Sequence, residues 1–107
     1  MRSRTGTTLV ALGAVAALGV AVPQSAHAAT GEFVYHVQPG DVARTLTHPM
    51  DGNCYPVGRN ARGKVVNNTD RRAVLYVEKN CRQTVAEELD PGQWSADSAF
   101  MSVLFTS

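Results

Sequence analysis

The sequence predicts an all-β domain, a small sandwich or barrel, on three observations. Short segments rich in β-branched and aromatic residues recur about every ten residues. Glycine, proline and asparagine lie between them, as in the turns that join antiparallel strands. A similar apolar segment closes each half of the region from residue 29 to residue 107, at Gly63–Val66 and at Met101–Leu104. This repeat indicates two four-stranded units that bury their apolar faces against each other.

The first 28 residues have the order of a secretory signal peptide. Arg2 and Arg4 give a basic start, Leu9–Val22 is an uncharged apolar run, and residues 26–28 (Ala-His-Ala) match a small-x-small cleavage site. The alternative is an N-terminal anchor helix, although the apolar run is short for a membrane span. We therefore expect a secreted, extracellular protein whose mature part, residues 29–107, is one small β domain without membrane contact after signal cleavage.

Cys54 and Cys81 are the only cysteines, and an exported chain enters an oxidising compartment. Two cysteines allow a single intramolecular pairing, so one disulfide is expected. Their separation of 27 residues excludes a CxxC redox or metal motif. The chain-entropy estimate for a loop of this length is on the order of 3–4 kcal/mol, which is large for a domain with a marginal core.

Six segments read as strands in chain order. They are Glu32–Val37, Cys54–Val57, Lys64–Asn67, Ala73–Glu78, Gln83–Leu89 and Ala99–Thr106. Ala73–Glu78 carries the strongest β pattern, whereas Gln83–Leu89 also has helical propensity. Val42–Pro49 fits either a strand, by alternation, or one helical turn that the proline ends. Six short strands at this spacing favour a small sandwich or barrel.

Turn signals separate these segments. They are Pro39–Asp41, Asp51–Asn53, Asn67–Asp70, Asp90–Gly92 and the exposed basic loop Gly58–Gly63. Asn and Asp side chains in such clusters bond their own backbone. Asn67-x-Thr69 also spells a glycosylation acceptor, for which turn chemistry is the favoured interpretation.

Charge is nearly balanced overall but unevenly distributed. The chain is almost neutral, with Lys and Arg numbering 10 and Asp and Glu numbering 9. Seven basic residues fall between positions 59 and 82: Arg59, Arg62, Lys64, Arg71, Arg72, Lys79 and Arg82. Only acidic residues follow: Glu87, Glu88, Asp90 and Asp97. This distribution fits either a basic and an acidic face or a mixed solvated surface. Without a basic cluster interleaved with aromatics, no nucleic-acid partner is expected.

The segment from Ala73 to Phe105 resembles the second half of a βγ-crystallin domain, which is built from two Greek-key motifs. Tyr76, Leu89, Pro91-Gly92 and Ser102-Val103 match the motif. Cys81 stands where the motif has an aromatic residue, and Gln83 replaces the glycine that its folded hairpin uses for positive φ. The resemblance covers about 30 residues and implies a Greek-key β sandwich. Killer-toxin-like proteins and metalloprotease inhibitors share this likeness, which implies a binding role.

The same resemblance implies a calcium motif between Asp97 and Ser102, and this motif is degenerate here. Asp97 and Ser102 match it, but Ser98 is a weak substitute and Met101 supplies no oxygen ligand. We expect no metal and no cofactor, and a surface turn leading into the last strand. Tyr35–Asp41 also resembles the first residues of a LysM module, and this second resemblance implies binding of cell-wall glycans.

No catalytic constellation stands out, so we expect no enzyme. His36 and His48 lack the ligand spacing of a zinc site, and the serines lack a nucleophile elbow. Glu87 and Glu88 are adjacent, so on a strand they face opposite ways. Six aromatics are predicted to be core: Phe33, Tyr35, Tyr55, Tyr76, Phe100 and Phe105.

Three residues are the candidates for partner binding. Trp94 follows a turn, where it either caps the end of the barrel, the favoured interpretation, or anchors a partner. Arg59 and Arg62 lie in the basic loop. The predicted function is a secreted non-enzymatic domain that binds an extracellular protein, as a protease inhibitor, a toxin-like protein or a small subunit of a secreted assembly. The alternative is a cell-wall glycan-binding module that uses Trp94 and Tyr35.

Overall fold

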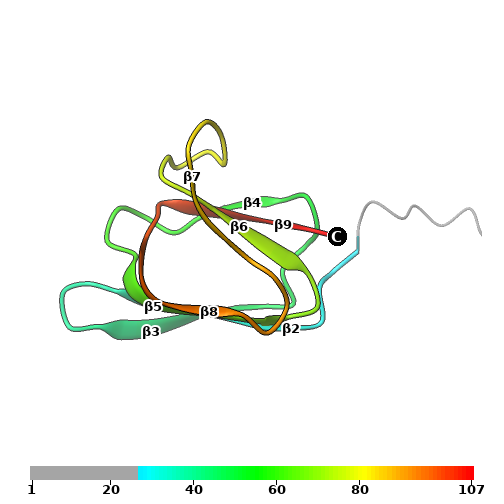
Figure 1. Cartoon of the computed structure of the whole chain (residues 1–107), viewed down its shortest axis with the longest axis horizontal. Helices are drawn as coiled ribbons and strands as arrows, with labels where there is room; N and C mark the ends of the chain where they lie inside the picture. The colour runs from blue at the N-terminus through cyan, green and yellow to red at the C-terminus, as the bar shows by residue number, and fades with distance from the viewer. Residues whose placement is uncertain (1–26) are drawn as a thin grey trace, which may run out of the picture.

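The computed structural model describes residues 27–107 as two packed antiparallel β sheets, with no helix in this part of the chain (Figure 1). The strands are β2 (Gly31–Val37), β3 (Val42–Thr47), β4 (Cys54–Pro56), β5 (Arg62–Thr69), β6 (Arg72–Tyr76), β7 (Val85–Leu89), β8 (Trp94–Ala99) and β9 (Ser102–Thr106). A disulfide joins Cys54 to Cys81. The predicted fold class, an all-β sandwich with one disulfide, is confirmed. The proposed leader lies almost wholly outside the described residues.

Each sheet contains strands from both halves of the chain. One sheet has the order β3-β2-β5-β8 and the other β4-β9-β6-β7. The first half, β2 to β5, therefore places β4 in the second sheet, and the second half, β6 to β9, places β8 in the first. β5 and β9 occupy equivalent inner positions and contain the two repeated apolar segments. The two four-stranded units expected from the sequence are thus present, with their third strands exchanged.

The core lies between the sheets and is rich in aromatic rings. Phe33 and Phe105 are fully buried, with ring centroids 5.3 Å apart in a T-shaped arrangement. Phe100 and Tyr35 complete the cluster, again at steep interplanar angles. Burial of each such side chain contributes about 1.5–3 kcal/mol. Four of the six aromatics predicted as core are therefore buried, while Tyr55 and Tyr76 are only half-buried.

Asn67 is a fully buried polar residue that ties three segments together. Its Nδ2 donates to the carbonyls of Arg71 and Leu89, both at 2.8 Å. Its Oδ1 accepts from the backbone N–H and the hydroxyl of Thr69. The expected side-chain-to-backbone bonding is present, but residues 67–69 belong to β5 rather than to a turn. The side-chain amide of Asn67, the acceptor atom of the Asn67-x-Thr69 sequon, is therefore buried and hydrogen-bonded.

Tertiary structure settles two segments for which the local sequence pattern was ambiguous. The Gln83–Leu89 segment, predicted as a strand despite its helical propensity, forms the shorter strand β7, which pairs with β6 in the register Ala73↔Leu89 to Tyr76↔Val85. Val42–Thr47 is a strand because it pairs along its whole length with β2. Tertiary pairing decides both segments, since neither has a decisive local preference.

β8 was not foreseen, and the predictions that fall on it need correction. Trp94 was expected in a loop, yet it is the first residue of β8, paired with Val66. The turn expected over Asp97–Ser102 is limited to Phe100-Met101, between β8 and β9, and it interrupts the predicted strand Ala99–Thr106. Ser98 and Ser102 in this segment are buried. The sequence Trp94–Ala99 has no β-branched residue, so its strand conformation depends on the pairing with β5.

The hairpin between β6 and β7 has residues in the left-handed backbone conformation, although Gln83 stands where the βγ-crystallin motif has a glycine. Gln83 has a φ of 72° and Cys81 a φ of 55°. A residue with a Cβ in this region costs about 1–2 kcal/mol, so the missing glycine is tolerated at an energetic cost.

We therefore expect Gln83→Gly to stabilise the fold by about 1 kcal/mol, after the entropy of glycine in the unfolded chain is subtracted. The unfolding midpoint should rise by roughly 4–8 °C in a thermal melt followed by circular dichroism. Arg82→Gly is the matched control, because Arg82 is exposed in the same loop without a positive φ. It should lower the midpoint. A lower midpoint for both variants would contradict the strain at Gln83.

Candidate functional site

Arg59 and Arg62 lie beside the turn between β8 and β9. The Val57 N–H donates to the Met101 carbonyl at 2.9 Å, and the Phe100 N–H donates to the Ala61 carbonyl at 3.2 Å. The Met101 N–H in turn donates to the Tyr76 carbonyl at 2.8 Å. These backbone bonds fix the β4–β5 loop, the β8–β9 turn and the end of β6 against one another. The loop Gly58–Gly63 is therefore held against the body of the domain, and Ala61 within it is buried.

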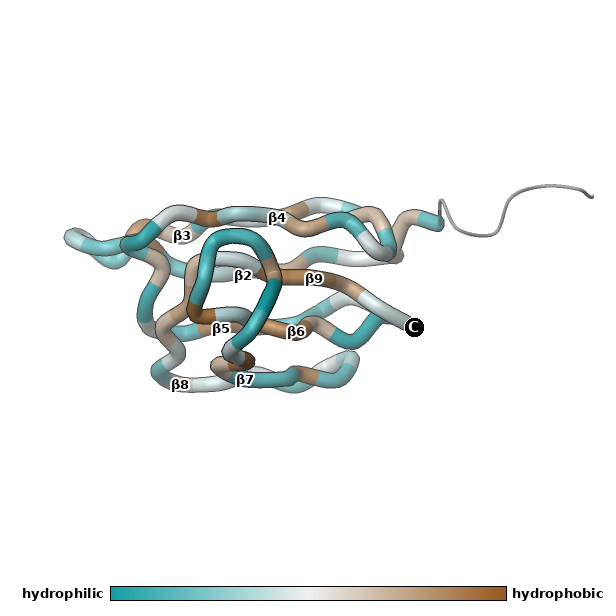
Figure 2. The backbone as a smooth tube through the Cα atoms, turned by 90° about the horizontal axis from the view of Figure 1, so that it is seen from above, coloured by the Kyte–Doolittle hydropathy of each residue, from teal (hydrophilic) through white to brown (hydrophobic). Residues whose placement is uncertain are grey.

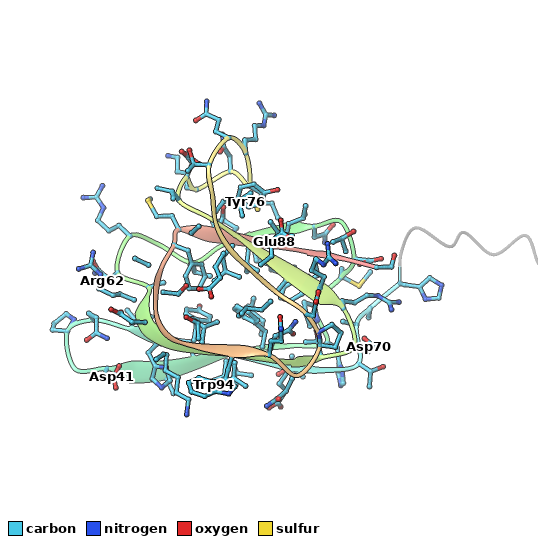
Figure 3. The ribbon with its side chains drawn as sticks, viewed as in Figure 1. Asp41, Arg62, Asp70, Tyr76, Glu88 and Trp94 are labelled. Atoms are coloured by element: carbon cyan, nitrogen blue, oxygen red, sulfur yellow. A yellow bond between two sulfur atoms is a disulfide. The ribbon has the colours of Figure 1, made fainter. Side chains whose placement is uncertain are left out.

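These three segments enclose a small cleft, which we call the corner cleft. Its volume is about 180 Å³, and it is lined by Arg59, Ala61, Arg62, Val77, Ala99, Phe100 and Met101. Phe100 and Ala61 are buried beneath it, whereas Val77 is 45% exposed. Figure 3 shows the Arg62 side chain extending outward from this end of the sandwich. The corner cleft thus combines an apolar interior with two guanidinium groups.

The two arginines of the corner cleft differ from the next pair along the chain. Arg72 lies 2.9 Å from Asp90 and 3.5 Å from Glu88, and Arg71 contacts Asp51 and Asp70. Within residues 27–107, Arg59 and Arg62 form no ion pair. Their charges remain available to an external anion.

Residues 77–84, between β6 and β7, form a projecting loop that stands away from the sandwich (Figures 1 and 2). Figure 2 shows that it is hydrophilic. The loop is closed by a 2.9 Å bond from the Val77 N–H to the Thr84 carbonyl. A 3.0 Å bond from the Thr84 N–H to the Glu78 carboxylate lowers the pKa of Glu78 below the ordinary value of 4.5.

The projecting loop is also fixed to the body of the domain. The disulfide joins Cys81 to Cys54 at the start of β4. The buried hydroxyl of Ser102 accepts from the Cys81 N–H at 2.9 Å and donates to the Glu78 carbonyl. This loop is therefore closed by its own hydrogen bonds and attached to the body of the domain at two points, the disulfide and Ser102.

Trp94 is a surface residue, so the prediction that it caps the end of the barrel is wrong. Its side chain is 60% exposed. Trp94 pairs with Val66, whereas the adjacent Val65 is fully buried, so the indole lies on the outer face of the first sheet (Figure 3). The Lys64 ammonium lies 5.5 Å from the ring centroid, within cation–π range.

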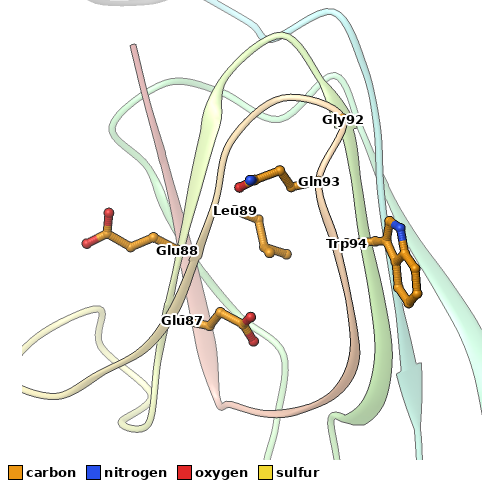
Figure 4. Close-up of a pocket in the computed structure, with 6 residues that line it drawn as sticks. All are labelled: Glu87, Glu88, Leu89, Gly92, Gln93 and Trp94. Atoms are coloured by element: carbon orange, nitrogen blue, oxygen red, sulfur yellow. The ribbon is translucent and has the colours of Figure 1, made fainter.

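A larger open cleft, of about 470 Å³, lies between β7 and β8. Its lining is Glu87, Glu88, Leu89, Gly92, Gln93 and Trp94 (Figure 4). Glu87 points between the sheets and accepts from the Ser98 hydroxyl, while Glu88 points the other way and pairs with Arg72. The two adjacent carboxylates therefore face opposite ways, as the strand pattern predicted. The Trp94 ring points away from this cleft in Figure 4.

The degenerate calcium motif is dispersed in the structure. Asp97 is exposed on β8, and the Ser102 hydroxyl is engaged by the projecting loop. Among residues 27–107, no group of three or more His, Cys, Asp or Glu side chains could hold a metal ion. The same residues contain no helix long and apolar enough to cross a membrane.

Tyr35, His36 and His48 lie outside the corner cleft and the projecting loop. Tyr35 is 9% exposed and belongs to the core, so its predicted contact with a glycan is wrong. His36 Nδ1 contacts the Lys64 carbonyl at 2.8 Å, and His48 Nδ1 lies near the Ala29 carbonyl and the Gly31 N–H. The histidine rings therefore have structural partners on the first sheet.

Four residues of the corner cleft were missed at the sequence level: Val77, Ala99, Phe100 and Met101. All four lie in segments predicted as strands, where apolar side chains are expected to be buried. Ala99–Thr106 was predicted as one strand, so the turn at Phe100-Met101, which brings its residues to one end of the sandwich, had no local signal. The spatial meeting of that turn with Arg59 is set by tertiary structure alone.

No protein-family model matches the chain, and no significant match is found among curated proteins or solved structures.

Proposed function

We propose that this protein is an exported, non-enzymatic binding domain that engages an extracellular protein through the corner cleft. The observation that carries the proposal is the pair of unpaired arginines beside an apolar depression. Apolar centres edged by arginine are typical of the energetically dominant parts of protein interfaces. The backbone bonds around the cleft hold its walls in place, which reduces the entropy lost on binding.

Among the proposed roles, this surface favours a toxin-like protein or a small subunit of a secreted assembly. A protease inhibitor would need a loop that enters a protease cleft. The loop Gly58–Gly63, the candidate for that role, is held against the domain, and Gly58 has a φ of 88°. The two Greek-key halves also support kinship with the βγ-crystallin-like group, which we keep as part of the proposal.

The test is affinity capture with the purified chain, using culture supernatant and cell-wall extract, and identification of captured proteins by mass spectrometry. We expect a stoichiometric protein partner that is retained by Trp94→Ala and lost by the double variant Arg59→Glu/Arg62→Glu. Arg44→Glu is the control for a charge reversal outside the cleft, since Arg44 is exposed on β3. Equal capture by the double variant and the wild type would refute a role for the corner cleft.

The exposure of Trp94 favours a second candidate, a glycan-binding module. Thr45, Val34, Val66 and Trp94 form one row across the four strands of the first sheet. An exposed indole on the outer face of a sheet offers a stacking surface for a sugar ring. This candidate predicts that Trp94→Ala abolishes retention on insoluble wall polymer while Arg59→Glu/Arg62→Glu does not. Unchanged retention of Trp94→Ala would eliminate it.

A further inference from the structure

We propose that the corner cleft recognises a protein segment in which one apolar side chain is flanked by carboxylates, and that the projecting loop forms the second side of this site. The inference rests on the proposed function and specifies the chemistry of the partner. It is carried by the size of the cleft, the charges around it and the attachment of the loop.

The interior of the cleft has room for one large apolar side chain. Its volume is about 180 Å³, and an apolar cavity of about 150 Å³ is sufficient to bind benzene. Phe100 and Ala61 form a buried floor, and Val77 and Met101 stand at its sides. An aromatic or leucine side chain in this space would cover the exposed part of Val77, which is otherwise left in water.

The charges around the cleft favour an acidic segment. Arg59 and Arg62 line it. Lys79 and Arg82 are exposed on the projecting loop, which begins at Val77 of the cleft lining. None of these four cations forms an ion pair within residues 27–107. The only carboxylate in the loop, that of Glu78, accepts from the Thr84 N–H. Asp41, near the start of β5, accepts from the Gln38 side chain.

The attachment of the loop makes it a fixed wall rather than a segment that must order on binding. The disulfide and the Ser102 hydroxyl hold Cys81, and the Val77–Thr84 bond closes the base of the loop beside the cleft. Ordering a mobile loop on binding costs conformational entropy and so weakens the affinity. Because the projecting loop is already ordered, this entropy is not lost when the partner binds.

A binding site for simple polyanions would need only the four cations and would leave the apolar interior empty. The two ligand classes therefore differ in how they depend on the central side chain. An acidic peptide with a central phenylalanine should bind better than one with a central serine, whereas a polyanion site would bind both equally.

The experiment measures fluorescence anisotropy of labelled synthetic peptides with the full chain. The first peptide has a central phenylalanine between glutamates, the second a central serine between glutamates, and the third a central phenylalanine between lysines. We expect the first to bind at least tenfold more tightly than the other two. Arg59→Glu/Arg62→Glu should reverse the order of the first and third peptides, and Arg44→Glu should not.

The apolar interior is tested by a matched pair of valines. Val77 lines the cleft and is 45% exposed, and Val85 is 43% exposed but lies outside it. Val77→Ser should weaken the first peptide about fivefold, which corresponds to roughly 1 kcal/mol, and Val85→Ser should have no effect. Because both side chains are half in water, neither change should unfold the domain.

Equal affinity for the phenylalanine and serine peptides, or equal effects of the two valine variants, would overturn the inference. Binding of inorganic polyphosphate as tight as that of the first peptide would do the same, in favour of a charge-only site. If the double arginine variant still captures a protein that Trp94→Ala loses, the inference fails while a protein-binding function stands. Absence of both peptide binding and protein capture would overturn both.

Discussion

Replacement of Cys54 and Cys81 by serine is expected to lower the free energy of unfolding by about 3–4 kcal/mol. The bridge closes a sequence separation of 27 residues and holds the projecting loop to β4. For a domain of this size the unfolding midpoint should fall by roughly 12 °C or more, in a thermal melt followed by far-ultraviolet circular dichroism. The loss is large because a small sandwich has little stability in reserve.

Two comparisons isolate the effect of the bridge from that of the substitutions. Wild-type protein under a reducing agent should show nearly the same midpoint as the double serine variant. Asn80→Ser, an exposed change in the same loop, should leave the midpoint almost unchanged. If the double serine variant had the same unfolding midpoint as the wild type, the disulfide would not stabilise the fold.

Asn67→Ala is expected to cost about 3 kcal/mol or more of stability. The substitution removes both donors to the Arg71 and Leu89 carbonyls and the acceptor of the Thr69 N–H. Each buried polar group left without a partner costs about 1–3 kcal/mol. Asn68→Ala is the matched control, because the next residue is exposed on the same strand. Chemical denaturation should give a much lower midpoint for Asn67→Ala and a near wild-type midpoint for Asn68→Ala.

A similar midpoint for both asparagine variants would show that the polar cluster around Asn67 contributes little. Asn67→Asp separates shape from hydrogen bonding, since it keeps the size of the side chain but replaces its amide donors by an acceptor. It should be destabilised nearly as much as Asn67→Ala, because the Arg71 and Leu89 carbonyls would then face a carboxylate.

The strands rich in β-branched and aromatic residues were predictable. Glu32–Val37 corresponds to β2, where alternation places Phe33 and Tyr35 in the core. Ala73–Glu78 corresponds to β6, whose continuous apolar run Ala73–Leu75 is buried. β8 was not predictable, because its serine and aspartate residues favour turns and its alanines favour helices. Its conformation comes from pairing with β5, which lies about 30 residues earlier in the chain.

The candidate site was predictable only in its charged residues. Arg59 and Arg62 stand out because they lie in a glycine-rich loop. The apolar part of the cleft forms where the β8–β9 turn and the β6–β7 loop come together at one end of the sandwich. A local sequence pattern cannot predict this tertiary contact. Trp94 illustrates the same limit: its place after a turn indicated a loop, but its register with Val66 decides which face carries the indole.

The exchange of β4 and β8 between the halves has a consequence for how the chain folds. β4 needs β9, with Cys54 paired to Leu104, and β8 needs β5, so each sheet is complete only when both halves are present. Neither half can therefore settle as an independent folding unit. Pairings between residues so distant in sequence require large loops to close first, which slows folding to about the millisecond-to-second range of other β sandwiches. The two halves, although repeated in sequence pattern, should fold in one cooperative transition.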